Sequence, residues 1–362
     1  MRLGTILPAA VLFTLSLTAT MRADDANCGG LITEPETYSC AAPSAAPRPQ
    51  EDDPPIALPE VACCNPRWTV TADAMFLWRV TPDQPLLLAQ PSGAGLLDAS
   101  CLQSRAAVAP RLSLIYHGDS DWDLESNCFG IDGWKATCNF PAPSSAGPTL
   151  YYLLNVDGTG GPNVTTAQFD YRSQFYSAEL NLRRRYNDWL TPMIGFRWLE
   201  LREQYLVSGT ESPLPVPYQH SVNANNQLYG CQLGVDAELW GHPGSRFRVE
   251  GILKAGLFYN GASQQSAFDD GGGTIYTPNG PVSASARKDC AAFFGEIGLN
   301  AVYQVSPHFA LRGGYRLLAA DGVALAPQQI FATGLLNIQA AGVNVKEDLL
   351  MHGVNAGVEV TW

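Results

Sequence analysis

Residues 227–240 alternate between apolar and polar side chains, and this period of two constrains the fold more than any other feature of the chain. One side of QLYGCQLGVDAELW carries Tyr229, Cys231, Leu233, Val235, Ala237 and Leu239. The other side carries Gly230, Gln232, Gly234, Asp236 and Glu238. Alternation over so many residues predicts a β-strand with one apolar and one polar face.

The same pattern recurs along the chain and predicts about ten strands. Clear alternation covers residues 68–80, 175–186, 247–259, 292–305 and 309–318. Weaker alternation covers 108–117, 121–130, 190–206 and 350–362. A further hairpin built from 148–156 and 332–343 would raise the number to twelve.

Short and long connections between these strands follow one another in strict alternation. The short ones are tight polar turns, HGDSD, NDWLTP, GHPGS and VSPH. The long ones cover roughly residues 81–107, 131–171, 207–225, 261–287 and 320–349. Nothing in a soluble sandwich requires this order, whereas an outer-membrane barrel has short periplasmic turns and long extracellular loops. The pattern therefore predicts an all-β fold, a transmembrane antiparallel up-and-down barrel of ten to twelve strands.

The N-terminal region predicts export. Residues 1–23 have a short basic start at Arg2, continue with an apolar run from Ile6 to about Leu17 and end in small residues. This order predicts a signal peptide cleaved after Ala23. This run is shorter than the ~20 residues of a membrane-spanning helix, and Pro8 interrupts it. Residues 24–66 are acidic and rich in proline, which predicts a disordered periplasmic segment before a barrel domain at 67–362.

Composition bears on the partners of the chain. The formal net charge is −12, which argues against a nucleic-acid partner. Charged residues make up 15 % of the chain, against roughly 25 % in typical soluble domains. Few charges, together with many glycines and prolines, indicate a fold rich in turns and poor in exposed salt-bridged helices.

Nine cysteines in an exported chain predict disulfides, with at least one thiol left over. Cys231 lies on the apolar face of its strand, so we expect a free thiol that is buried or faces lipid. No cysteines or histidines have the spacing of metal ligands, and we expect neither a metal nor a cofactor.

The last strand, GVNAGVEVTW, predicts how the barrel is assembled. It alternates up to the terminal aromatic residue, with Val358, Val360 and Trp362 on one face. Such an ending resembles the signal read by the outer-membrane barrel assembly machinery. An ordinary edge strand that happens to end in tryptophan is the alternative.

Two segments resemble the β-barrel porin family of planctomycete bacteria. The segment 178–207 resembles the family's E-x-N strand, turn and G-F-R strand followed by an acidic position, and it matches at Glu179, Asn181, Gly195, Phe196, Arg197 and Glu203. The close of the chain resembles the family's H-G-x-x-x-G strand through His352, Gly353 and Gly357. The resemblance implies an outer-membrane barrel in a Gram-negative-type envelope.

In such a barrel the apolar faces contact outer-membrane lipid and the polar faces line the interior. Glycines on the inner face make room, and opposite charges can pair across the axis. The residues predicted to line the lumen are Glu179, Arg183, Arg197, Glu238, Arg248, Glu250, Glu296, Arg312, Arg316 and Glu359. They are the candidate functional site, either as a pore lining or as a structural plug.

No enzymatic grouping is visible, because the five histidines are scattered and no Ser-His-Asp or Cys-His set occurs. We therefore expect a protein that is not an enzyme. One hypothesis is a porin-like barrel that passes small hydrophilic solutes through a lumen lined by Glu and Arg. The other is a structural or surface-interaction barrel with a plugged lumen and disulfide-tied outer loops. Barrels near eight strands are filled by their own side chains, so ten strands leave little bore.

Overall fold

The computed structural model describes residues 67–80, 86–89, 95–98, 106–141, 149–150, 163–212, 217–242, 245–269, 282–332 and 342–362. The predicted signal peptide (1–23) and the acidic segment (24–66) lie outside these residues, so both stay predictions. Within the described ranges, no helix has the length and hydropathy that crossing a bilayer requires.

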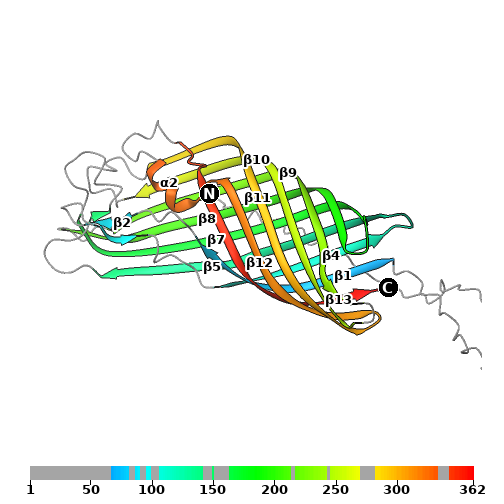
Figure 1. Ribbon diagram of the computed structural model, residues 1–362. Helices are drawn as coiled ribbons and strands as arrows, with labels where there is room; N and C mark the ends of the chain where they lie inside the picture. Colours follow the sequence, from blue (N-terminus) through cyan, green and yellow to red (C-terminus); the bar gives the residue numbers. More distant parts are fainter. Residues whose placement is uncertain are drawn as a thin grey trace, which may run out of the picture. The chain divides into compact units, whose positions relative to one another are not determined.

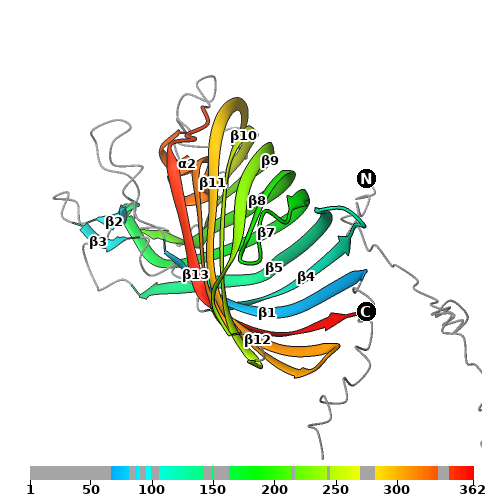
Figure 2. The same ribbon diagram turned by 45° about the vertical axis from the view of Figure 1, so that its right-hand side comes forward.

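Ten long antiparallel strands form a closed barrel, and each pairs with the next long strand along the chain (Figures 1 and 2). They are β1 (Trp68–Val80), β4 (Ala107–His117), β5 (Trp122–Pro141), β7 (Asn163–Arg184), β8 (Leu190–Ser212), β9 (Pro217–Gly241), β10 (Phe247–Asp269), β11 (Val282–Ser306), β12 (Phe309–Val323) and β13 (Glu347–Thr361). The ring closes where β1 pairs with β13, from Thr69 opposite Thr361 to Val80 opposite Leu350. The predicted up-and-down barrel of about ten strands is confirmed.

The two ends of the barrel differ. At the end we call the turn end, the predicted tight turns join β4 to β5, β7 to β8, β9 to β10 and β11 to β12. The first and last strands also meet there, since the amide of Trp362 donates to the carbonyl of Trp68 over 3.0 Å. At the opposite, loop end lie three short strands, β2 (Leu86–Ala89), β3 (Gly95–Asp98) and β6 (Thr149–Leu150). They pair with one another and with the start of β7.

The strands are longer than the alternation predicted. β9 and β11 each have 25 residues, whereas about 9–11 suffice for a bilayer. Much of the predicted loops 131–171 and 207–225 is therefore strand. The sequence pattern missed these extensions because the polarity of the two faces is inverted there. In SVNANN (221–226) the outer side chains Ser221, Asn223 and Asn225 are polar, whereas Val222 and Ala224 face inwards.

The outer surface carries an apolar belt between two sets of aromatic residues. Near the turn end the aromatic residues include Trp122, Trp189, Trp240, Phe247 and Tyr303, and nearer the loop end they include Trp78, Tyr229, Tyr259 and Tyr315, all of them exposed. Between them lie exposed Leu and Ile side chains, such as Leu233, Leu253 and Ile297. At ~3.3 Å per residue and a tilt of roughly 40°, the stretch from Phe247 to Tyr259 rises about 30 Å. That height matches the hydrocarbon core of a bilayer.

The connection after β12 turns into the barrel and does not run outside it. Gly322 has a φ of +80°, a conformation that favours glycine, at the point where the pairing of β12 with β13 is irregular. The chain then forms a short helix, α2 (Ala326–Ala332), which packs against β8, β9 and β10. Residues 323–329 are all buried, so this inward-folded segment (322–329) fills part of the loop end.

Three of the cysteines in the described ranges are free thiols, Cys128, Cys231 and Cys290. Cys231 is exposed on the outer face, as the alternation predicted. Cys128 lies on β5 and Cys290 lies on β11. The predicted disulfides stay predictions.

Candidate functional site

The inner face of every barrel strand changes from polar to apolar as it runs from the turn end to the loop end. On β1 the change falls between Asp73 and Met75, and on β11 between Glu296 and Phe294. The corresponding apolar residues on the other strands are Ala109, Phe129, Phe175, Leu199, Leu228, Phe258, Leu318 and Met351. Because the strands are aligned by their pairing, these changes give two stacked zones, a charged cluster and an apolar layer.

Glu296 on β11 is the centre of the charged cluster. Its carboxylate accepts hydrogen bonds from Arg197 on β8 over 3.0 Å, from Arg316 on β12 over 2.7 Å and from Arg111 on β4. The Glu296 side chain has no exposed surface. A fully desolvated carboxylate of this kind is stable only because several charge-assisted hydrogen bonds replace water.

Glu179 on β7 extends the cluster across the barrel. It lies 3.6 Å from both Arg111 and Arg197 and accepts a hydrogen bond from Lys254 on β10 over 2.8 Å. Lys254 also donates to Glu125 on β5, 3.1 Å away. The ion pairs thus join strands that are not neighbours in the sheet.

The cluster continues to the turn end through Arg183, which lies 3.3 Å from Glu125 and 2.9 Å from Asp236. A second group lies at the turn end itself. Arg312 lies 3.2 Å from Glu359 and 3.6 Å from Asp73, and Arg248 lies 2.7 Å from Glu359.

The turn-end group is less buried than the centre. The side chain of Arg248 is 26 % exposed, whereas that of Arg197 has no exposed surface. Solvent therefore reaches into the barrel from the turn end, and we call this opening the vestibule. Taken together, the acids and the cations of the cluster and vestibule are equal in number, so their charges balance. The acids are Asp73, Glu125, Glu179, Asp236, Glu250, Glu296 and Glu359, and the cations are Arg111, Arg183, Arg197, Arg248, Lys254, Arg312 and Arg316.

Glycines on the inner face make room for these polar side chains. A Cβ at Gly195 would lie 2.1 Å from the Oδ1 atom of Asn181, and one at Gly357 would lie 2.1 Å from the Oδ1 atom of Asp73. Real Cβ atoms do not approach so closely, so only glycine fits at these positions. The sequence prediction that inner glycines make room is consistent with these distances.

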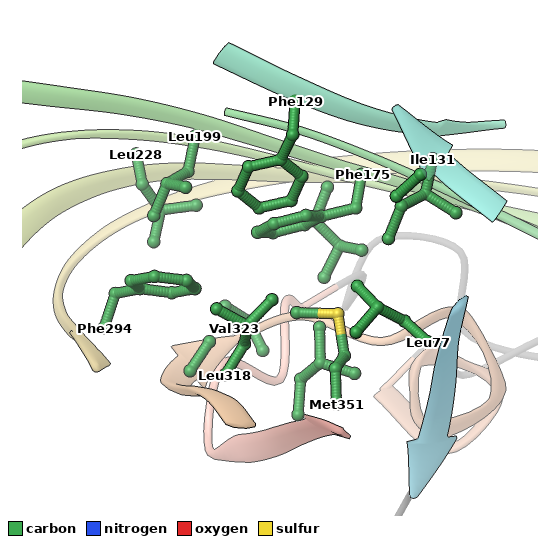
Figure 3. Close-up of a cluster of buried hydrophobic side chains, with 14 of the residues drawn as sticks. Leu77, Phe129, Ile131, Phe175, Leu199, Leu228, Phe294, Leu318, Val323 and Met351 are labelled. Carbon is green, nitrogen blue, oxygen red and sulfur yellow. The ribbon is translucent and has the colours of Figure 1, made fainter. Parts of the chain in front are cut away.

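The apolar layer crosses the whole interior (Figure 3). Phe129, Phe175 and Leu228 point from one wall towards Leu318, Val323 and Met351 on the other. The ring of Phe175 lies 5.7 Å from that of Phe129 and 6.1 Å from that of Phe294.

The apolar layer rests directly on the charged cluster. The guanidinium of Arg197 lies 4.4 Å from the ring centroid of Phe294 and 5.8 Å from that of Phe129. The same guanidinium makes these cation–π contacts and donates a hydrogen bond to Glu296. Packed apolar side chains therefore separate the charged side chains of the cluster from the loop end.

On the loop-end side of the apolar layer, a third charged group binds the inward-folded segment. Glu203 lies 2.6 Å from Arg79 and accepts a hydrogen bond from the amide of Ala326 over 2.8 Å. Asn226 binds both backbone groups of Ala324, each over 2.7 Å. These buried contacts hold the segment across the loop end of the barrel.

Nine of the ten residues predicted to line the lumen lie in the cluster or vestibule. Glu238 is the exception. It is exposed and takes part in no ion pair within the described residues. Its strand partner is Glu250, so Glu238 has the parity of the inner face and lies near the turn end of β9. Glu238 lies outside the cluster and vestibule, and Asp236 contributes the acid of β9.

Sequence reasoning did not select five members of the cluster or vestibule: Asp73, Arg111, Glu125, Asp236 and Lys254. Each has the parity of the polar face of its strand, which is the signal that could have found it. Arg111 and Glu125 lie in segments where the alternation was weak, and this hid them.

Of the residues predicted as an assembly signal, Trp362 is exposed next to Trp68 at the seam of the barrel. Val358 and Val360 are partly exposed on the same strand. Their recognition by assembly machinery stays a prediction. Within the described ranges, no three His, Cys, Asp or Glu residues are grouped so that they could hold a metal ion.

No family model and no curated protein matches the chain, so the resemblance to planctomycete porins stays a prediction. Several solved structures are similar. The outer membrane protease OmpT from Escherichia coli is 10 % identical, with 82 % of this chain and 97 % of that chain covered and a TM-score of 0.45. The toluene transporter TodX from P. putida is 11 % identical, covers 83 % and 90 %, and has a TM-score of 0.34. A major outer membrane protein from Thermus thermophilus is 10 % identical, covers 82 % and 98 %, and has a TM-score of 0.32. Similarity of this degree leaves activity open.

Proposed function

We propose that this chain is an integral outer-membrane barrel with a closed interior, which anchors its loop end at the cell surface. The observation that carries the proposal is the apolar layer. It crosses the interior from one wall to the other. Its members Leu199 and Leu318 are fully buried, and so is Phe169, which lies in a separate apolar cluster. This is the structural or surface-interaction alternative of the two hypotheses drawn from the sequence.

The outer surface supports the membrane location. Exposed Leu and Ile side chains on a soluble protein would cost solubility, because large continuous apolar surfaces promote association. In a bilayer the same belt contacts lipid, and the closed ring leaves no backbone edge unpaired. The aromatic residues at both margins occupy the levels at which such side chains meet the membrane interfaces.

Cell fractionation tests the location. The mature chain should be recovered with the outer membrane and should run on gels at a different apparent mass when it is not heated. Recovery as a detergent-free soluble monomer would contradict the proposal.

Planar-bilayer recordings test the closed interior. We expect no steady conductance from the wild-type chain, because hydrated ions cannot cross a layer of packed Leu, Phe and Met side chains. The double variant Phe175→Ala/Phe294→Ala removes the middle of the aromatic stack and should admit water and leak. Regular conductance steps from the wild type would refute the closed interior.

Passage of small hydrophilic solutes is the second candidate, and the vestibule favours it. Arg248, Glu250 and Arg312 form a charged, partly exposed opening at the turn end, as a selective entrance would require. Passage also requires that the apolar layer and the inward-folded segment move aside. If wild-type conductance steps changed their ion selectivity in Arg312→Ala, the passage hypothesis would be favoured and the closed-barrel proposal would be refuted.

A further inference from the structure

The outer face of the barrel carries a polar groove beyond the apolar belt at the loop end. The groove has a volume of about 740 Å³ and spans β7 to β11. Its lining includes three arginines, Arg172, Arg202 and Arg287, together with several amide and hydroxyl side chains. We propose that this groove binds the headgroup of an anionic glycolipid in the surrounding membrane leaflet.

Strand register places the groove residues in one continuous row. Arg202 on β8 is opposite Asn225 on β9, and Asn225 is level with Ser263 on β10, which is opposite Arg287 on β11. Strands lie about 4.8 Å apart, so roughly 14 Å of donor-rich surface separates Arg202 from Arg287. A disaccharide headgroup with an anionic group at each end fits this span, with its hydroxyls facing Asn225 and Ser263.

The charge of the groove matches such a ligand. Arg172 is on β7, diagonally next to Arg202, since its strand partner is Gln204. No ion pair joins Arg172 or Arg287 to an acid in the described part of the chain. Arg202 is oriented by Glu200, 2.7 Å away, and keeps a side chain that is 44 % exposed. The one acid in the lining, Glu203, directs its carboxylate inwards to Arg79.

The height of the groove selects a lipid headgroup over a soluble anion. Arg202 follows Trp198 by four residues on the same strand, and Ser263 follows Tyr259 by the same interval on β10. The row therefore lies about 10 Å beyond the aromatic residues that mark the margin of the belt. Headgroups are concentrated at this level, and arginine binds phosphate or carboxylate through paired hydrogen bonds.

The experiment uses the full chain folded in zwitterionic detergent micelles. Native mass spectrometry or calorimetry measures binding of a diphosphorylated disaccharide lipid, the same lipid without phosphates, and inorganic phosphate. We expect the diphosphorylated lipid to bind at least about tenfold more tightly than the other two. Arg172→Gln/Arg287→Gln should weaken its binding about tenfold, because both substituted side chains are exposed cations of the groove.

Arg184→Gln is the matched control. Arg184 is an exposed arginine on β7 at the opposite end of the belt, where its guanidinium lies 5.5 Å from the ring of Trp122. This variant should bind the lipid like the wild type. Equal affinity of the groove variant and the wild type would overturn the proposal, as would equal binding of the lipid without phosphates or competition by inorganic phosphate at the same concentration.

The inference rests on the membrane location proposed above, and the two can fail separately. Flotation with vesicles of zwitterionic lipid tests membrane insertion without any anionic glycolipid. A chain that floats but shows no arginine-dependent binding refutes the groove alone. A chain that does not float refutes the membrane location, whatever the micelle titration shows.

Discussion

Substitution of Glu296 by Gln should be the most destabilising single change in the charged cluster. The change keeps the shape of the side chain and removes one negative charge from a fully buried site. Arg316 then has no other acid partner in the described residues, while Arg111 and Arg197 keep only Glu179, 3.6 Å from each. Breaking a buried ion pair by removing one partner costs about 3–5 kcal/mol, because the remaining charge stays desolvated.

Urea unfolding of the folded barrel in vesicles or micelles, followed by tryptophan fluorescence, measures this cost. Glu238→Gln is the matched control, since Glu238 is an exposed glutamate of the same barrel and should change the unfolding free energy by less than about 1 kcal/mol. The double variant Glu296→Gln/Arg316→Gln should be less destabilised than the sum of its single variants, with an interaction energy of about 0.5–3 kcal/mol. If Glu296→Gln unfolded at the same urea concentration as Glu238→Gln, the cluster would not stabilise the barrel.

Two further substitutions test the outer face and the inner glycines. Leu233→Arg should lower the stability of the folded barrel by about 2–4 kcal/mol and impair membrane assembly, because the new charge faces lipid. Its control, Gln204→Arg in the polar groove, should assemble normally. Equal assembly of the two variants in a vesicle-folding assay would argue against the apolar belt. Gly195→Ala should lower the unfolding free energy by about 1–3 kcal/mol because its Cβ meets the backbone and side chain of β7, whereas Gly133→Ala, with 3.7 Å to the nearest atom, should be neutral in the same urea titration.

The outer half of the fold followed directly from sequence. Alternation fixes which side chains face outwards, because the period of a strand is two whatever its neighbours are. Leu233 and Leu253 were predicted to face lipid and are exposed, while Gln232 was predicted to face inwards and is buried beside Glu179 and Asn181. The short turns were also predicted, since their polar, glycine-rich and proline-rich composition is local.

The interior could be predicted only in part, because it depends on contacts between strands far apart in sequence. Parity placed Glu296 and Arg197 inside, but their direct contact requires the register of the intervening strands. The inward-folded segment gave no periodic signal at all. Its burial depends on Glu203 and Asn226, which lie about a hundred residues earlier and bind its backbone. For the same reason the sequence could not distinguish a pore lining from a plug.

The close packing of the interior also changes the expected effect of adding a charged side chain at an inner position. The sequence alone predicts that Gln232→Arg is tolerated, because water or opposed acids inside a barrel could accept the new charge. Gln232 is 2 % exposed and already donates to Glu179, so an arginine there would add volume and a further cation to a packed cluster. We now expect this variant to be destabilised.

The balanced charges of the interior explain how the barrel could hold one register without a conventional dry core along its whole length. A strand that slips by one residue turns its inner face towards lipid. A slip of β11 would therefore expose the Glu296 carboxylate to the bilayer, leave Arg316 without its acid partner and leave Arg111 and Arg197 with Glu179 alone. The apolar layer alone would resist such a slip weakly, because its Leu, Phe and Met side chains are also tolerated in lipid. The charged cluster towards the turn end and the apolar layer towards the loop end therefore act together. The apolar layer excludes water, and the ion pairs penalise every register except the observed one.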